Sequence, residues 1–325
     1  MKTTLVITSV ILFEVFAASA DVAVDSLELP KANVNIRVVD ENQKPVKGAD
    51  VSLYFDDKLV NGVTDLNGVF TGEGQCNIAG IGSKITKAGY YLGSAPIPRF
   101  SQVNSTLNQW EPWGGTYDVV LRPVINPIPL FVKKVDTIIP VLDKPCGYDL
   151  EVGDWVEPYG KGFTADFVFN IHKSVKDVRN FDAQGYLAFS NPMDGLQSAL
   201  PLDIAKNSIF KWERLSPENG YEQSFHLQNT WLSASKAKPI KSFKTNTEWD
   251  GYFFRVRSIA QDGNIVSAHY GKIAGGIEIY PRQTATCSIR FTFYYNPTPL
   301  DRNLEWDPSH DLFGQLNRKS IPREP

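Results

Sequence analysis

Residues 34–55 read VNIRVVDENQKPVKGADVSLYF, and two alternating segments flank a turn within this stretch. Apolar residues stand at every second position, first at Ile36 and Val38 and then at Val51, Leu53 and Phe55. A period of two places alternate side chains on one face of a β-strand. Each segment therefore predicts a strand that buries one face in a core.

Two turns separate these strands from each other and from the next one. Pro45 has no amide to donate to a sheet and Gly48 is free to adopt positive φ, so the chain is expected to reverse there. In Thr64-Asp65-Leu66-Asn67-Gly68, the Asp65 and Asn67 side chains can bond nearby amides, which predicts a tight hairpin. A calcium loop that starts at Asp65 is the alternative, but the remaining ligand pattern is missing.

This order of strands and turns, followed by Lys87-Ala88-Gly89-Tyr90, resembles the carboxypeptidase regulatory-like domain over residues 32–122. The family is also described as transthyretin-like or prealbumin-like. The resemblance implies a seven-stranded β-sandwich that rarely performs chemistry and is attached to many unrelated secreted proteins, some of them peptidases. The rest of the chain lies outside the resemblance.

The first twenty residues indicate export. Lys2 precedes a mostly apolar run from Leu5 to Phe16, in which Glu14 is the charged residue, and Ala18-Ser19-Ala20 fits a cleavage site. This pattern is typical of a secretory signal peptide. We expect a mature chain that begins near Asp21 and is secreted, periplasmic or held at the cell surface, with no membrane span after signal removal.

Length and composition predict an all-β protein with two cores. Removing 20 of the 325 residues leaves about 305, more than one core usually serves. The 24 glycines and 21 prolines suit short strands joined by turns, and no stretch shows sustained helical periodicity. After a lead-in over residues 21–31 and the sandwich over 32–122, we expect a proline-rich junction over 123–130 and a second β-sandwich or jelly-roll over 131–325.

Details of the second domain follow from local pattern. Ser288 to Tyr295 alternates polar and aromatic residues, which predicts a strand with an aromatic inner face. A short helix is possible within Leu202 to Trp212. From Asn296 onward prolines are frequent and apolar residues are few, so we expect a loop that wraps the domain.

Charge and cysteines exclude several classes of function. The 33 basic and 36 acidic residues give a net charge of −3, which does not predict a nucleic-acid partner. Cys76, Cys146 and Cys287 lack the spacing of metal ligands, so we expect the thiols to pack as small hydrophobic groups.

Motifs for catalysis were sought in the sequence. It contains no G-x-S-x-G, H-E-x-x-H or P-loop pattern, and the glycine cluster from Gly80 to Lys84 is expected to be a loop. Four histidines are widely separated, so any grouping of them would have to arise from folding. We assign no catalytic residue, no metal ligand and no cofactor.

Acidic residues gather in one segment, at Asp149, Glu151, Asp154 and Asp166. They could converge as calcium ligands or as a general acid–base pair. Alternatively they line an edge strand and face water, and this interpretation is favoured. A second group is expected to form surface ion pairs that hold the tail, and it comprises Asp301, Arg302, Glu305, Trp306 and Asp307.

Aromatic rings beside prolines and glycines are candidates for binding. Trp110, Trp113 and Tyr117 surround a Pro-Gly-Gly turn, and Trp155 and Tyr159 flank Pro158. Such rings can stack on the apolar face of a sugar. The alternative is that they plug the end of a sandwich, which is the more common role of such residues.

Two functions of different class follow from these patterns. The first is an exported, non-catalytic binding or structural protein with a polysaccharide or another envelope component as its partner. The second is a secreted hydrolase of glycans or peptides with carboxylate chemistry in the second domain. An accessory role beside a peptidase also stays open because of the resemblance.

Overall fold

A computed structural model describes residues 28–314, except residue 79 and residues 233–239, 245–250 and 282–284. The protein is all-β, as predicted, and its described residues contain no α-helix. Within this part of the chain no helix is long and apolar enough to cross a membrane. The expected signal peptide, residues 1–20, lies outside the described residues.

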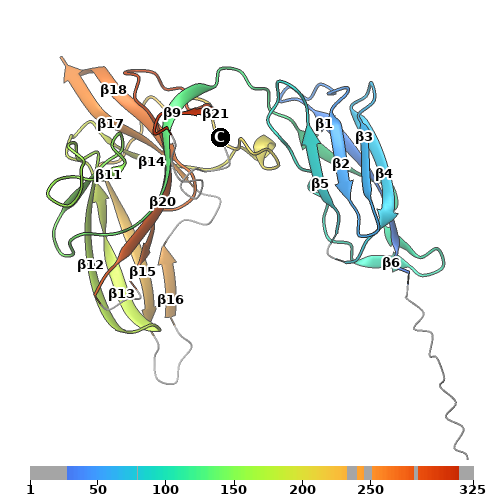
Figure 1. Cartoon of the computed structure of the whole chain (residues 1–325), viewed down its shortest axis with the longest axis horizontal. Helices are drawn as coiled ribbons and strands as arrows, with labels where there is room; N and C mark the ends of the chain where they lie inside the picture. Colours follow the sequence, from blue (N-terminus) through green and yellow to red (C-terminus); the bar gives the residue numbers. More distant parts are fainter. Residues whose placement is uncertain (1–27, 79, 233–239, 245–250, 282–284, 315–325) are drawn as a thin grey trace, which may run out of the picture.

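The described residues form two β-sandwiches with separate hydrophobic cores, which lie at opposite ends of the molecule (Figure 1). The N-terminal sandwich pairs a sheet of order β4-β1-β7-β6, with β8 beside β1, against a sheet of order β3-β2-β5. Its eight described strands, one more than the resemblance implies, are β1 (Lys31–Val39), β2 (Asp50–Tyr54), β3 (Leu59–Val63), β4 (Val69–Gln75), β5 (Gly82–Thr86), β6 (Gln102–Asn104), β7 (Gln109–Glu111) and β8 (Gly115–Val120).

The turn between β3 and β4 forms by the local chemistry that the sequence predicts. One carboxylate oxygen of Asp65 accepts the backbone amides of Asn67 and Val69, each at 2.8 Å. Gly68 has φ of +73°, and a Cβ there would overlap the carbonyl oxygen of Val38. Only glycine fits such a position without strain, so the predicted turn is confirmed. The expected hairpin was wrong, because β3 pairs with β2 and β4 pairs with β1, so the turn carries the chain from one sheet to the other.

The C-terminal sandwich pairs a sheet of order β11-β10-β12-β13-β15-β16 against one of order β14-β17-β18-β20-β9-β21, in which β19 also pairs with β20. Its strands are β9 (Ile128–Ile138), β10 (Cys146–Asp149), β11 (Asp154–Trp155), β12 (Phe167–Asp177), β13 (Asn180–Ala188), β14 (Gly195–Ala199), β15 (Ser224–Leu232), β16 (Ile240–Lys244), β17 (Gly251–Gln261), β18 (Asn264–Ile273), β19 (Glu278–Tyr280), β20 (Ser288–Asn296) and β21 (Trp306–Asp311).

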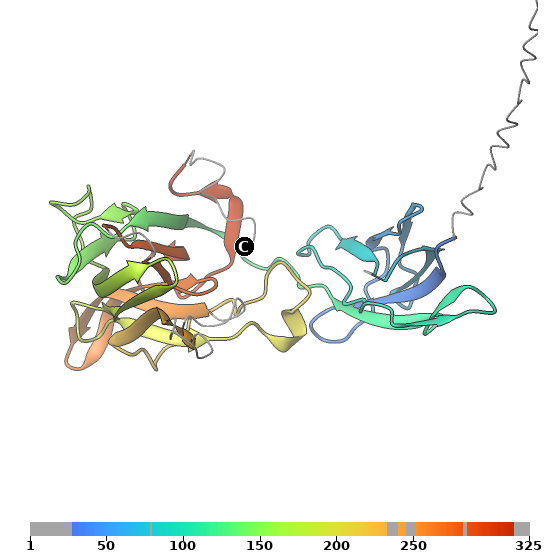
Figure 2. The same cartoon turned by 90° about the horizontal axis from the view of Figure 1, so that it is seen from below.

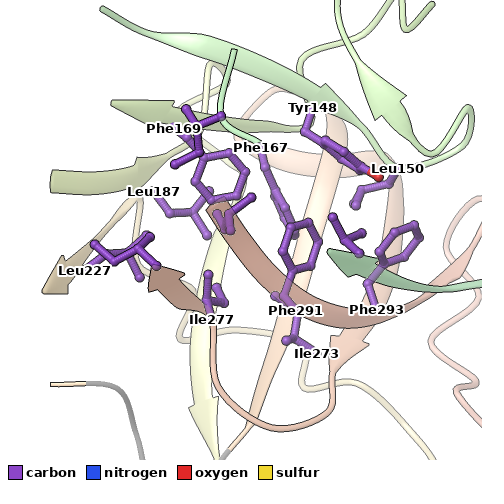
Figure 3. Close-up of a cluster of buried hydrophobic side chains, with 14 of the residues drawn as sticks. Tyr148, Leu150, Phe167, Phe169, Leu187, Leu227, Ile273, Ile277, Phe291 and Phe293 are labelled. Carbon is purple, nitrogen blue, oxygen red and sulfur yellow. The ribbon is translucent and has the colours of Figure 1, made fainter. Parts of the chain in front are cut away.

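Aromatic side chains from the two sheets meet in the C-terminal core (Figure 3). Phe167 and Phe169 of β12 each lie 6.0 Å from the ring of Phe291 on β20, measured between ring centroids. The inner face of β20 is therefore aromatic, as its alternation predicts. Burying each ring stabilises the fold by roughly 1.5–3 kcal/mol.

The possible short helix within residues 202–212 is a single 3₁₀ turn, η1 (Asp203–Ala205), after which Ser208 pairs with Gly93 of the other sandwich. Two local predictions were wrong. Part of the expected glycine loop is strand β5, which pairs with β2. The tail is not all loop, because β21 pairs in parallel with β9 and its Trp306 packs on Tyr294 at 5.7 Å.

The three cysteines are buried among apolar side chains, as predicted. Cys76 lies in the N-terminal core, and Cys146 and Cys287 lie in the C-terminal core. Burial raises the pKa of each thiol to about 11. At neutral pH almost none of each thiol is thiolate, so these side chains are poor nucleophiles.

Candidate functional site

Three of the four candidate acids converge on one arginine of β17. Arg257 donates to Asp166 from Nε at 2.8 Å and from Nη2 at 2.9 Å, and to Asp149 from Nη2 at 3.0 Å. It also donates to Glu151. We call these four residues the Arg257 cluster. Arg257 has φ of +55°, a conformation that a residue with a side chain rarely adopts.

Backbone amides occupy the same carboxylates. Asp149 accepts the amides of Val152, Phe163 and Thr164 at 2.9–3.1 Å. Burial alone would raise the pKa of Asp149, but these amides and Arg257 outweigh it and hold the pKa below its ordinary value. Asp166 accepts one amide, from Leu150 at 2.9 Å, and burial raises its pKa. Both oxygens of both carboxylates are thus already bonded within the protein.

Asp154 lies apart from the Arg257 cluster. Its oxygens accept the amides of Trp155 at 2.9 Å and Lys161 at 3.1 Å, so it shapes a turn. The favoured interpretation, an edge strand with its acids in water, was wrong for Asp149 and Asp166, which are only 2% and 3% exposed. Asp149 and Asp166 do converge, but they surround the guanidinium of Arg257 and do not form an acid–base pair or a calcium site. Among the described residues, no group of three or more His, Cys, Asp or Glu side chains is arranged to hold a metal.

Two of the candidate rings fill the cores. Trp110 is 7% exposed, stacks on Phe100 with ring centroids 5.5 Å apart, and donates its indole N–H to the carbonyl of Cys76 at 2.7 Å. Trp155 is 4% exposed and packs edge-on against Tyr148 at 5.3 Å. Neither ring presents a face to a ligand, because both plug the end of a core.

The other candidate rings reach the surface to different extents. Trp113 is 38% exposed and Tyr159 is 44% exposed, while Tyr117 is half-buried against the N-terminal core. The amide of Trp113 donates to Glu111 at 3.2 Å. Glu111 in turn lines an open polar hollow of about 560 Å³, the rim depression, together with Ser101, Gln102, Asn104 and Pro112.

The segment that carries η1 lies between the two sandwiches in Figure 2. A buried ionic contact, which we call the seam, joins the two sandwiches there. Arg122, which follows β8 and is 1% exposed, donates to the carbonyls of Phe210 at 2.9 Å and Trp212 at 2.6 Å. Its Nε bonds Glu41 at 2.6 Å, and Glu41 also accepts Arg214 of the C-terminal sandwich at 3.1 Å. One carboxylate thus bridges a cation from each sandwich.

Glu305 closes the seam from the other side. It is 1% exposed and accepts the hydroxyl of Tyr91 and the amides of Ile125 and Asn126, each at 2.9 Å. The expectation that Glu305 makes a surface ion pair was therefore wrong. The sequence gives no signal for this role, because Glu305 is separated from its donor partners by 179 to 214 positions.

The seam predicts a pH dependence of stability. Burial alone would raise the pKa of Glu41, but the bonds from Arg214 and Arg122 outweigh it and hold the pKa below its ordinary value. A carboxylate whose pKa is lower in the folded than in the unfolded state stabilises the fold fully when the pH is above its unfolded-state pKa, which is about 4.3 for glutamate. This stabilisation disappears as the pH falls through the folded-state pKa. The melting temperature of Glu41→Gln should therefore fall below that of wild type most at neutral pH, with the gap narrowing below about pH 4. A gap that stays constant down to the acid end of the titration contradicts this assignment.

The four histidines are only partly brought together. His269 bonds the hydroxyl of Tyr295, and His310 bonds Asp307 at 2.6 Å. His172 and His226 both line a hollow on the outer face of the C-terminal sandwich, beside Tyr186. Sequence reasoning missed Tyr186; the available signal was the polar alternation of its strand, with an aromatic residue at an outward position.

Comparison with known proteins adds little. No family model matches the chain, and no curated protein matches it. Among solved structures, a proposed carbohydrate-binding protein from Bacteroides uniformis is 8% identical over 84% of this chain and 99% of its own, with a TM-score of 0.19. BcpA, the major pilin subunit of Bacillus cereus, is 13% identical over 80% and 95%, with a TM-score of 0.22. A Bacteroides fragilis protein of unknown function, proposed to be membrane-associated, is 11% identical over 83% and 98%, with a TM-score of 0.21. TM-scores this low establish no shared fold.

Proposed function

We propose that this chain is an exported, non-catalytic binding protein that holds a polysaccharide at the rim of its N-terminal sandwich. The observation that carries the proposal is the 38% exposed side chain of Trp113, which directly follows Glu111 and Pro112 in the lining of the polar rim depression. Export to the cell surface or beyond rests on the signal-like residues 1–20. Assignment of residues 32–122 to the regulatory-like family belongs to the same proposal and rests on the pattern of strands and turns.

The chemistry of the rim suits a sugar. A pyranose presents C–H groups on its faces and hydroxyls at its edge. A flat ring contacts the face, while the hydroxyl of Ser101, the amides of Gln102 and Asn104 and the carboxylate of Glu111 bond the edge. The hollow is open, which suits a chain that passes across it more than a small molecule that must be enclosed.

The hydrolase alternative needs a carboxylate that faces its substrate. In the Arg257 cluster, Asp149 and Asp166 use their oxygens for backbone amides and for the guanidinium. Their role in holding the fold explains both their burial and their opposite pKa shifts without a reaction. An accessory role beside a peptidase rests on the resemblance alone.

Calorimetric titration with a panel of soluble glycans tests the rim. We expect Trp113→Ala to weaken binding about tenfold, since an aromatic contact contributes roughly 0.5–1.5 kcal/mol beyond the area that it buries. Tyr54→Ala is the matched control, because Tyr54 is 48% exposed on the other sheet of the same sandwich and should leave the affinity unchanged. Lack of binding across the panel, or equal loss in both variants, refutes the rim site.

A further inference from the structure

The outer face of β12, β13 and β15 carries a second group of polar side chains. Ile171, Ala183 and Leu227 point into the core, so the residues between such inward positions point outward. In register across the three strands, the outward rows are Asn170–Tyr186–His226, His172–Gln184–Gln228 and Ser174–Asp182–Thr230. The face lies on the C-terminal sandwich, far in sequence from the rim depression.

The composition of these rows differs from an ordinary solvated face. Amides, hydroxyls and imidazoles dominate, where exposed strand positions often carry lysine or glutamate. Asp182 is the single carboxylate of the nine positions, and it already accepts Gln184 at 2.8 Å and the hydroxyl of Thr230. The three strands therefore offer many hydrogen-bonding groups to a ligand and little fixed charge.

A hollow of about 300 Å³ lies in the first two rows. Tyr186 is 53% exposed at its centre, and its ring meets that of His226 edge-on with centroids 5.2 Å apart. Gly185, between Gln184 and Tyr186, also lines the hollow with its backbone. A half-exposed ring beside these hydrogen-bonding groups is arranged to receive a flat partner.

We propose that this face binds an uncharged saccharide chain, with a sugar ring stacked on Tyr186. The side chains of Asn170, His172, Gln184 and His226 bond the sugar hydroxyls. Low fixed charge on the three strands matches a neutral ligand, and the nearby carboxylate of Asp143 is already paired with His172. Strands β13 and β15 each have a hydrogen-bonded neighbour on both sides, whereas β10 pairs with β12 only at residues 167–169.

Histidine resonances give a direct test on the whole protein. The chain has four histidines, of which His172 and His226 line the hollow and His269 and His310 lie on the other sheet. Neutral oligosaccharides of glucose, xylose and mannose are titrated into protein labelled with ¹³C at histidine, with oligogalacturonate as the charged comparison. We expect a neutral oligosaccharide to shift the ring signals of His172 and His226 in a saturable manner and to leave the other two unchanged.

Two variants distinguish saccharide binding at the Tyr186 hollow from saccharide binding at the rim depression. Tyr186→Ala should weaken the binding that these shifts report by about tenfold. Trp113→Ala should leave those shifts intact, so loss of the rim site and loss of this site are read separately. The proposal is overturned if the neutral panel moves neither histidine, if only oligogalacturonate moves them, or if Tyr186→Ala binds as tightly as wild type.

Discussion

Replacing Arg257 by glutamine is expected to lower the free energy of unfolding by about 3–5 kcal/mol, because removing one partner of a buried ion pair leaves the other charge uncompensated. Asp149 and Asp166, 2% and 3% exposed, would keep their backbone bonds but lose the cation. Urea denaturation followed by tryptophan fluorescence measures the loss, since a salt denaturant would screen the ion pairs under study.

The pH dependence of this loss carries a definite sign. Burial already raises the pKa of Asp166, and without Arg257 that pKa must rise further. A carboxylate with a raised folded pKa costs stability above that value, and protonation relieves the cost. The deficit of Arg257→Gln should therefore be greatest at neutral pH and smaller in acid. Arg290→Gln, which breaks an exposed pair with Asp136, should change stability by under about 1 kcal/mol.

The same variant bears on function. If Asp149 and Asp166 serve only to hold residues 149–166 against β17, then Arg257→Gln changes stability and leaves binding at the rim and at Tyr186 intact. A variant with wild-type stability at neutral pH would show that the cluster does not hold the fold. The acids would then be available for the chemistry that the hydrolase alternative requires.

Local sequence chemistry predicted the parts of the fold that local chemistry determines. Alternation located β1, β2 and β20, and Asp65 with Gly68 specified the turn between β3 and β4, although not that this turn joins the two sheets. Strand β21 escaped prediction because its apolar content is low and its stability comes from pairing with β9, well over a hundred positions earlier. Strand β5 was not predicted, because its glycine-rich start is typical of a loop and it becomes a strand only by pairing with β2.

Candidate sites were harder to predict for the same reason. The clustering of Asp149, Glu151 and Asp166 was anticipated as one alternative, but the cation at its centre is 91 to 108 positions away. Proline beside Trp110 and Trp155 left two interpretations open, a binding platform or a plug at the end of a sandwich, and both rings turned inward as the plug requires. Proximity along the chain identifies neighbours, whereas burial and charge pairing depend on which strands the sheets bring together.

Replacing Arg122 by alanine is expected to cost about 3–5 kcal/mol and to uncouple the two sandwiches. In wild type this guanidinium bonds two carbonyls and Glu41 while it lies 4.5 Å from the centre of the Phe210 ring. Its removal leaves buried acceptors unpaired at the point where the sandwiches meet, and each unpaired group costs about 1–3 kcal/mol. Differential scanning calorimetry should show one transition in wild type and two in the variant.

Two further variants decide whether the seam acts through geometry or through charge alone. Arg122→Lys keeps the charge, but an ammonium group lacks the planar fork that serves several acceptors at once, so we expect it to resemble Arg122→Ala more than wild type. Arg37→Ala removes an arginine of the same sandwich whose pair with Asp118 is exposed, and it should leave the single transition unchanged. If Arg122→Ala still melts in one transition at the wild-type temperature, then the seam does not couple the sandwiches. The two sandwiches would then be joined only by the polypeptide chain. The proposed sites at the rim depression and at Tyr186 would in that case move independently of each other and would not be held at a fixed separation.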